Sequence, residues 1–259
     1  ANGRFGFAAR TTLSLAQALY EKHKVLTYPR TDARALPEDY LGTVKATMEA
    51  LIDAKSYSAF AAEVLKKKWV KPNRRIFDNA KVSDHFAIIP TLQAPKSLTE
   101  IEAKLYDLVV KRFLAVFYPS AESMVTTRIS TVAVGGKEHQ FQTNGKVLVK
   151  PGWLAVYGKE AQEDDANLVA AAQGEKVKAA DVDVLALKTK PPARYTEATL
   201  LSAMEGAGKL IDDDELREAM REKGLGTPAT RAQTIEGLIY EKYMLREGRE
   251  LVPTAKAFQ

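Results

Sequence analysis

The stretch LTYPRTD at residues 26–32 decides how the rest of the chain is interpreted. It places the phenol of Tyr28 and the guanidinium of Arg30 on either side of a single proline. Because a proline disfavours helix for the residue before it, we expect Tyr28 on an extended connector and not inside a helix. The phenol and the guanidinium could then engage one phosphate together. Taken alone, a tyrosine in a connector is more often a half-buried packing residue.

Basic residues gather around this stretch. Residues 1–34 carry six Lys or Arg against two acidic side chains, and a second group of six bases lies between residues 66 and 75. The formal net charge of the 259-residue chain is +5. Such clusters are often ordinary solvated surface. Because Lys and Arg neutralise phosphates and release counterions, nucleic acid is nevertheless the first partner to consider.

Composition excludes several other classes of protein. Hydrophobic residues make up 46% and charged residues 27%, as in ordinary globular proteins, and no apolar run reaches the roughly 18 residues of a membrane span. The absence of Cys excludes a disulfide scaffold and thiolate metal sites. The three histidines are scattered, and the acidic run at 212–215 is typical of a helix cap. We therefore expect no metal site in this chain.

Residues 1–119 show mainly helical periodicity. Apolar side chains recur at helical spacing in four segments, and Ser97 or Thr99 is the expected cap of the last one. For the first helix, Thr11 or Thr12 is the expected cap. The expected helices cover residues 11–22, 36–54, 58–68 and 99–117.

The pattern changes after Pro119. Residues 124–134 alternate and are rich in Thr, Val and Ile, while Gly135–Gly136 and Asn144–Gly145 each indicate a hairpin turn. A polar loop at 159–167 and renewed strand character at 175–187 complete an antiparallel β region. Beyond Pro191 the sequence predicts short helices at 196–205, 212–222 and 230–242, and a closing hairpin around Glu247–Gly248.

Three motifs in this order resemble the type IA DNA topoisomerases. Residues 27–34 are similar to the active-site signature of that family, roughly TYPRTDSR, with Ala33 where Ser is usual. Residues 84–91 (DHFAIIPT) are similar to the H-x-A-I-x-P-T segment, which makes His85 the matching histidine. The third match joins 191–200 (PPARYTEATL), with Met204 and Glu205 following, to 224–232 (GLGTPATRA). Thr227 and Lys242 favour the topoisomerase III branch.

The resemblance implies a reaction. Tyr28 would attack a backbone phosphorus to give a 5′-phosphotyrosyl link, and Arg30 would stabilise the charge on the non-bridging oxygens. The resemblance places His85 beside the active site, in contact with a DNA phosphate. It implies that the helix that begins within the Gly224–Ala232 element holds another phosphate at its N-terminus. The expected DNA-binding residues are Arg34, Arg194, Thr230 and Arg231.

The fold implied is an α+β multidomain arrangement. Residues 1–119 would form a helical domain carrying the nucleophile, 120–190 an antiparallel β gate or hinge domain, and 191–259 a partial helical DNA-binding domain. Both ends of the chain are abrupt, which suggests a piece of a longer protein. In the family, Mg²⁺ is bound by an acidic Toprim domain, so no metal is expected on this fragment.

Single-stranded DNA is the expected partner of a monomer in the bacterial cytoplasm, associated with the nucleoid, with no membrane or small-molecule substrate. Two functional alternatives remain open at this point. The intact enzyme would pass one strand through a transient break in another. The isolated chain could instead be a catalytically inactive module that binds single-stranded DNA and forms the gate. A scaffold for protein partners has no positive sequence feature behind it.

Overall fold

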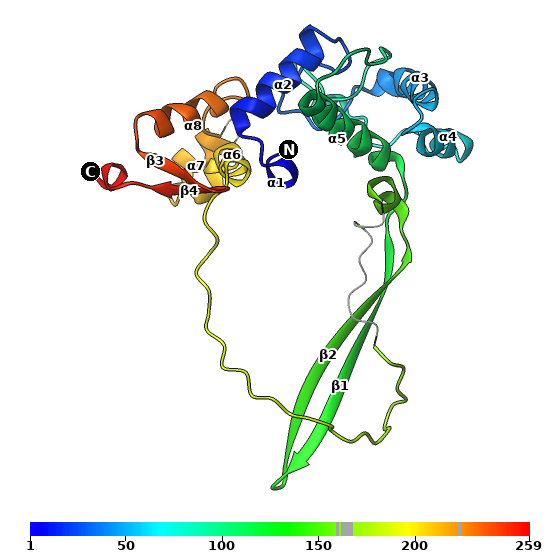
Figure 1. Ribbon diagram of the computed structural model, residues 1–259, viewed down its shortest axis with the longest axis vertical. Coiled ribbons are helices and arrows are strands. Elements are labelled where there is room, and N and C mark those ends of the chain that lie inside the picture. The colour runs from blue at the N-terminus through cyan, green and yellow to red at the C-terminus, as the bar shows by residue number, and fades with distance from the viewer. Residues whose placement is uncertain (159–160, 162–167, 222–223) are drawn as a thin grey trace. The chain divides into compact units, whose positions relative to one another are not determined.

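The computed structural model describes residues 1–158, 161, 168–221 and 224–259. They form two compact units, the first made of Ala1–Leu114 with Pro192–Gln259 and the second of Ala115–Pro191. The first unit is largely helical, and the second is built around one long hairpin (Figure 1). The α-helices are α1 (Asn2–Phe5), α2 (Ala9–Glu21), α3 (Leu41–Ile52), α4 (Ser58–Lys66), α5 (Glu100–Phe117), α6 (Glu197–Glu205), α7 (Asp214–Arg221) and α8 (Arg231–Tyr240). Short 3-10 turns cover Glu38–Tyr40, Asn79–Lys81, Gly152–Tyr157, Ala207–Leu210 and Ala255–Phe258.

The core of the first unit is formed by the apolar faces of its longer helices. Leu19 of α2, Val44 and Met48 of α3, and Val110 and Leu114 of α5 have no exposed surface. Their spacing of three or four residues within a helix brings them to one face, as the sequence pattern predicts. The expected helix at 36–54 begins late, because residues 38–40 form a 3-10 turn before α3.

Of the two expected caps of α5, Thr99 is confirmed, because its hydroxyl accepts from the Glu102 amide at 3.4 Å. The hydroxyl and amide of Thr99 both donate to Glu102 Oε2 at 2.8 Å. His23 Nε2 lies 3.2 Å from the other carboxylate oxygen. Glu102 is buried, and the hydrogen bonds from Thr99 and then from His23 lower the pKa of its carboxyl. The Glu102 carboxylate thus completes the capping of α5 and joins α5 to His23, just after α2.

The start of α2 differs from expectation. The helix begins at Ala9, before both Thr11 and Thr12, so neither threonine can be its cap and that prediction is wrong. The Ala9 amide donates to Glu197 Oε2 at 2.6 Å, and the carboxylate comes from α6, 188 residues away. Because a tertiary contact satisfies the first amide, no local hydroxyl is needed there.

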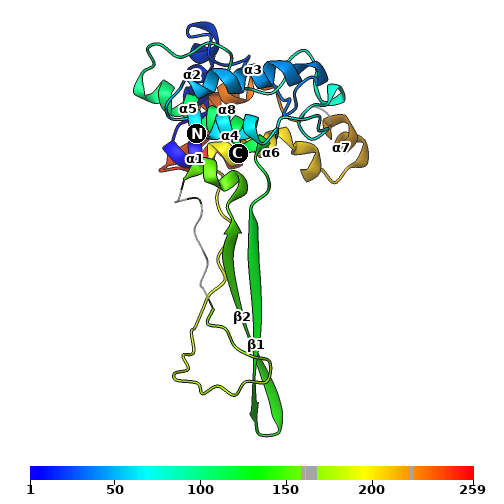
Figure 2. The same ribbon diagram turned by 90° about the vertical axis from the view of Figure 1, so that its right-hand side faces the viewer.

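The second unit contains β1 (Glu122–Val134) and β2 (Lys137–Lys150), which pair antiparallel along their whole length (Figure 1, Figure 2). Gly135 and Gly136 both have positive φ and form the expected turn. The second turn, expected at Asn144–Gly145, is wrong. Neither residue has positive φ, and they face Thr127 and Thr126 in an unbroken register. The Gly135–Gly136 turn fixes the register between β1 and β2, and pairing with β1 keeps Asn144 and Gly145 extended.

The strand expected over residues 175–187 is also wrong. Residues 168–191 are described throughout, and none of them belongs to a strand. Val184 is 95% exposed and Leu187 is 86% exposed, so the alternating apolar side chains do not pack against any other described part of the protein. Alternation makes a strand only where a neighbouring backbone supplies hydrogen bonds. Most of the loop expected at 159–167 lies outside the described residues.

The last part of the chain returns to the first unit. The three expected short helices are confirmed as α6, α7 and α8, except that residues 222–223 lie outside the described part. The closing hairpin is confirmed as β3 (Met244–Glu247) and β4 (Glu250–Pro253). Among the described residues, no helix is both long and apolar enough to cross a membrane.

Candidate active site and nucleic-acid interface

Two motifs that are 60 residues apart in the sequence lie side by side. The Thr27 amide donates to Ile89 O at 3.0 Å, and the Ile89 amide donates to Thr27 Oγ1 at 2.9 Å. Further along, the Ala87 amide donates to Ala35 O at 2.9 Å. Leu26 also forms an antiparallel bridge with Pro90. These bonds fix the connector that carries Tyr28 against the segment that carries His85.

Tyr28 lies on a connector outside any helix, as its following proline predicts. Its ring is half-buried and packs against two aromatic rings. The ring centroid of His85 is 4.1 Å away with the planes tilted by 34°, and that of Tyr20 is 5.4 Å away, edge to face. The body of the phenol is thus held by packing, and the imidazole of His85, on an exposed residue, lies directly against it.

Arg30 is exposed two residues beyond Tyr28. Its guanidinium is permanently charged and can bind two oxygens of one phosphate, a geometry that an ammonium group does not offer. Arg194 is likewise exposed. It stands just before Tyr195, whose carbonyl accepts a hydrogen bond from the Leu251 amide at 2.7 Å. The backbone beside Arg194 is therefore anchored while its side chain faces solvent.

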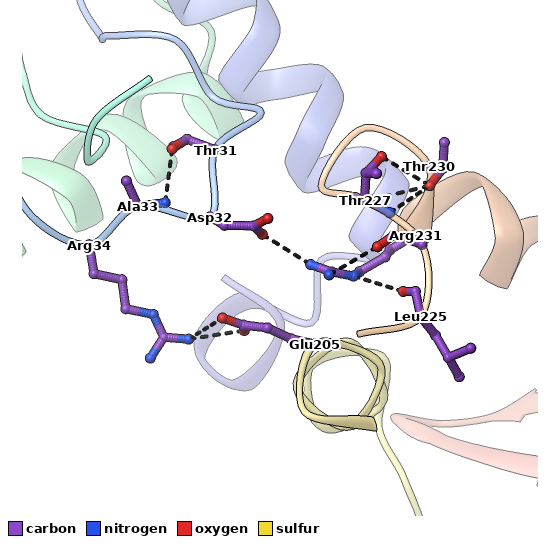
Figure 3. A network of polar contacts seen from close by, with 10 residues as sticks. Thr31, Asp32, Ala33, Arg34, Glu205, Leu225, Thr227, Thr230 and Arg231 are labelled. Carbon is purple, nitrogen blue, oxygen red and sulfur yellow. Dashed lines mark hydrogen bonds and ion pairs between the residues drawn. The ribbon is translucent and has the colours of Figure 1, made fainter. Parts of the chain in front are cut away.

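Two ion pairs join the segment after Tyr28 to the last part of the first unit (Figure 3). Arg34 Nη2 donates to both carboxylate oxygens of Glu205, each at 2.9 Å. Asp32 Oδ1 accepts from Arg231 Nη1 at 3.2 Å. In between, the hydroxyl of Thr31 accepts from the Ala33 amide at 3.0 Å, which shapes the bend of the segment.

Arg231 is buried, unlike the other basic residues expected to bind DNA. Besides Asp32, its guanidinium donates to Leu225 O at 3.0 Å and to Gly226 O at 3.1 Å. These bonds fasten the turn before α8 to the segment that carries the nucleophile. A direct DNA contact of Arg231 stays a prediction. Its hydrogen bonds to Leu225 O and Gly226 O hold the turn before α8 in shape.

The turn at 224–230 requires its glycines. Gly224 has φ +61°, and a Cβ there would lie 2.4 Å from Met204 O. The Leu225 amide donates to the same carbonyl at 2.7 Å, so this close approach holds the turn against the end of α6. Thr230 is exposed, and its hydroxyl accepts from the Thr227 amide at 2.9 Å. The expected phosphate contact of Thr230 stays a prediction.

A cavity of about 440 Å³ lies between the segment after Tyr28, α2, α6 and the start of α8. Its wall combines apolar side chains such as Leu13, Ile88 and Leu201 with charged ones. The charged groups of both ion pairs line it: Asp32, Arg34, Glu205 and Arg231. The cavity thus borders directly on the segment that carries the nucleophile.

Glu197, at the start of α6, is a second buried anchor on the cavity wall. It binds the Ala9 amide and accepts from Arg246 Nε at 2.7 Å, and Arg246 also pairs with Glu236. The hydrogen bond that Arg246 donates to Glu197 is the main cause of the raised pKa of its guanidinium. This network joins the start of α2, α6, α8 and β3.

The acidic run at 212–215 caps a helix, as expected. Asp213 Oδ1 accepts from the Leu216 amide at 2.9 Å in the first turn of α7. Within residues 1–158, 161, 168–221 and 224–259, no three His, Asp or Glu side chains are grouped so that they could hold a metal ion. The described residues therefore do not fit a magnesium site.

Sequence reasoning missed several residues of this region. Tyr20, Asp32, Glu197 and Arg246 were not expected at the site, and no role was assigned to Glu205. Asp32 and Glu205 both stand inside or next to the motifs quoted above, and this position is the only feature of the sequence that could have pointed to them. Their partners lie 199 and 171 residues away, and no local pattern indicates such pairings.

Comparison with known proteins identifies the class to which this fold and site belong. A family model described as DNA topoisomerase matches residues 1–259. DNA topoisomerase 3 of Bacillus subtilis is 40% identical over 270 residues, an alignment covering 100% of this chain and 36% of the relative. DNA topoisomerase 3 of Bacillus licheniformis is 41% identical over 269 residues, with the same coverage.

Among solved structures, full-length topoisomerase I from Thermotoga maritima matches with a TM-score of 0.67 and 25% sequence identity. The match covers 98% of this chain and 38% of that one. The chain therefore belongs to the type IA DNA topoisomerase family, and its relatives place it on the topoisomerase III side. Its fold is an α+β arrangement of helices with small antiparallel sheets. The chain spans about a third of the length of these relatives.

Proposed function

We propose that this chain supplies the nucleophile and part of the strand-binding surface of a DNA topoisomerase that cleaves and rejoins one DNA strand. The observation that carries the proposal is the contact between the two motifs, which places the rings of Tyr28 and His85 4.1 Å apart. A packed, half-buried phenol with an exposed arginine two residues away is a suitable arrangement for attack on a phosphodiester.

In the proposed reaction, the oxygen of Tyr28 forms a bond to a backbone phosphorus and the bond to the 3′-oxygen breaks. The phenol loses its proton, the departing 3′-oxygen gains one, and the products are a 5′-phosphotyrosyl link and a free 3′-hydroxyl. Rejoining is the reverse, so the energy of the phosphodiester is retained and no ATP is consumed. Arg30 stabilises the charge on the non-bridging oxygens, and His85 contacts the same phosphate.

The remaining basic residues are assigned to strand binding. Exposed Arg34 and Arg194 contact phosphates directly, and Thr230 does so from the start of α8. Arg231 holds the turn before α8 in place, and its own contact with a phosphate remains part of the proposal. We assign residues 1–119 as the nucleophile-bearing domain, 120–190 as the gate and 191–259 as part of the DNA-binding domain. The partner is single-stranded DNA, bound by a monomer in the bacterial cytoplasm.

We infer that magnesium is bound by a part of the intact enzyme outside these residues. The relatives are nearly three times longer than the alignment, and the family resemblance assigns the metal to a Toprim domain. The chain by itself is then a binding and gate module that holds the nucleophile without completing cleavage.

The test of the nucleophile uses the full-length enzyme. Tyr28→Phe removes only the attacking oxygen, so relaxation of supercoiled DNA and the covalent complex should both disappear. Tyr20→Phe is the matched control, since it removes a hydroxyl from the neighbouring ring, and it should keep both activities. Relaxation by the Tyr28→Phe enzyme would contradict the assignment. A covalent adduct between the 259-residue chain and labelled single-stranded DNA in Mg²⁺ would contradict only the inactive-module inference.

A further inference from the structure

The two ion pairs that line the cavity differ in how firmly they are held. The Arg231 side chain is 7% exposed and binds two backbone carbonyls as well as Asp32, whose own side chain is 59% exposed. The Arg34 side chain is 82% exposed and its partner Glu205 is 40% exposed. Because exposed ion pairs contribute little to stability and are screened by salt, the Arg34 guanidinium can leave its partner at small cost. The Arg231 guanidinium is instead held in place by its two carbonyl acceptors, Leu225 O and Gly226 O.

Arg34 also keeps binding capacity while it is paired. Its two hydrogen bonds to Glu205 both leave from Nη2, and a guanidinium has five N–H donors. Among the described residues, its contacts run through that nitrogen alone. Figure 3 shows the rest of the Arg34 guanidinium turned away from the carboxylate. A phosphate can therefore approach the open edge before the ion pair breaks.

Glu205 stands where a carboxylate is unfavourable for its own helix. It is the last residue of α6, and the C-terminal end of a helix repels a negative charge. Glu197, by contrast, is the first residue of α6, where the dipole favours it. Helix stability therefore accounts for a carboxylate at Glu197 but not for one at Glu205. Within the described residues, the Glu205 carboxylate contacts Arg34, and both residues line the cavity.

From this geometry we propose that Glu205 holds the Arg34 guanidinium in the DNA-free protein and yields it to a backbone phosphate when a strand binds. Both ligands are anions that accept hydrogen bonds from the same guanidinium, so the carboxylate occupies the place that a phosphate takes. A phosphate and Glu205 repel each other, so binding favours rotation of Glu205 into solvent. Arg231 stays bound to the Leu225 and Gly226 carbonyls and keeps the turn before α8 in place.

The exchange rests on the proposed function, in which a single strand binds beside Tyr28. It adds a competitor: a strand phosphate takes the place of the Glu205 carboxylate on Arg34 only when the Arg34–Glu205 ion pair opens. Removing the negative charge of Glu205 should therefore strengthen DNA binding, and it should do so only while Arg34 is present.

The test measures the affinity of the 259-residue chain for a fluorescently labelled single-stranded oligonucleotide by anisotropy. Low salt maximises the effect, and EDTA prevents cleavage. Glu205→Gln should tighten binding by about two- to five-fold, the range expected from the strength of one exposed ion pair. Arg34→Ala should weaken binding. In the Arg34→Ala background, the Glu205→Gln change should leave the affinity unaltered.

The matched control is Glu49→Gln, which removes the same charge from an exposed position of α3 that does not line the cavity. An equal gain with Glu49→Gln, or an equal gain from Glu205→Gln with and without Arg34, would show general charge repulsion and overturn the exchange. A wild-type chain that does not bind the oligonucleotide contradicts the proposed function and the exchange with it. Wild-type binding without a gain specific to Glu205→Gln overturns the exchange alone. Circular dichroism confirms that each variant is folded.

Discussion

The helical unit and the β1–β2 hairpin bury their side chains very differently. In the helical unit, Leu19 and Val110 have no exposed surface, whereas in the hairpin Ile129 is 49% and Phe141 is 57% exposed. A two-stranded hairpin has no second layer of its own to cover its apolar side chains, and such hairpins are only marginally stable in isolation. The free energy of folding is therefore concentrated in the unit that carries Tyr28, and the hairpin depends mainly on its backbone ladder.

The largest expected effect comes from truncating the buried core. Leu19→Ala should lower the free energy of unfolding by about 2–5 kcal/mol, because it removes buried methyl groups and leaves a cavity. Ile129→Ala in the hairpin should cost only about 0.5 kcal/mol, because half of that side chain is already exposed. Urea unfolding followed by circular dichroism measures both. Equal losses at the two positions would remove the distinction between the units.

An intermediate effect is expected at the buried arginine. Arg231→Ala should cost about 2–3 kcal/mol, because it leaves the Leu225 and Gly226 carbonyls without their donor and removes the partner of Asp32. Arg34→Ala removes an exposed partner and should cost about 0.5 kcal/mol or less. The same unfolding measurement compares them. A change at Arg34 as large as that at Arg231 would contradict the description of one firm and one exchangeable pair.

The smallest expected effect is a pH dependence inside the helical unit. The carboxyl pKa of Glu102 is lowered from its usual 4.5 by the hydrogen bonds from Thr99 and His23. A group with a lowered pKa contributes stability that is fully present above its unfolded pKa and is lost as the pH falls through its folded pKa. Glu102→Gln should therefore be less stable than the wild type near neutral pH, and the difference should narrow below about pH 4.5.

Thermal unfolding at a series of pH values measures this effect, and Glu100→Gln is the control. Glu100 lies in the same first turn of α5, and its hydrogen bond with Lys104 also lowers the pKa of its carboxyl. Because the Glu100 side chain is exposed, solvent screens this pair, and the pH-dependent difference for Glu100→Gln should be smaller than that for Glu102→Gln. A gap between wild type and Glu102→Gln that stays constant down to low pH would contradict the role given to the ionised carboxylate.

Much of the fold follows from local sequence. The helices around Leu19, Met48 and Val110 are encoded by apolar spacing, and the Gly135–Gly136 turn by the one residue type that tolerates its backbone angles. Two of the wrong predictions share a cause. Asn144–Gly145 and residues 175–187 carry patterns that suit a turn or a strand, but the outcome depends on whether a partner backbone lies alongside.

The helical segments, the connector at Tyr28 and the family that three motifs resemble could all be predicted from the sequence. These features depend on residues within a few positions of one another, so steric preference and periodicity suffice to predict them. Only the tertiary structure decided which carboxylate binds the start of α2, and that Arg231 is buried while Arg34 is exposed. Those outcomes depend on segments 171 to 199 residues apart, whose packing sets burial and pairing.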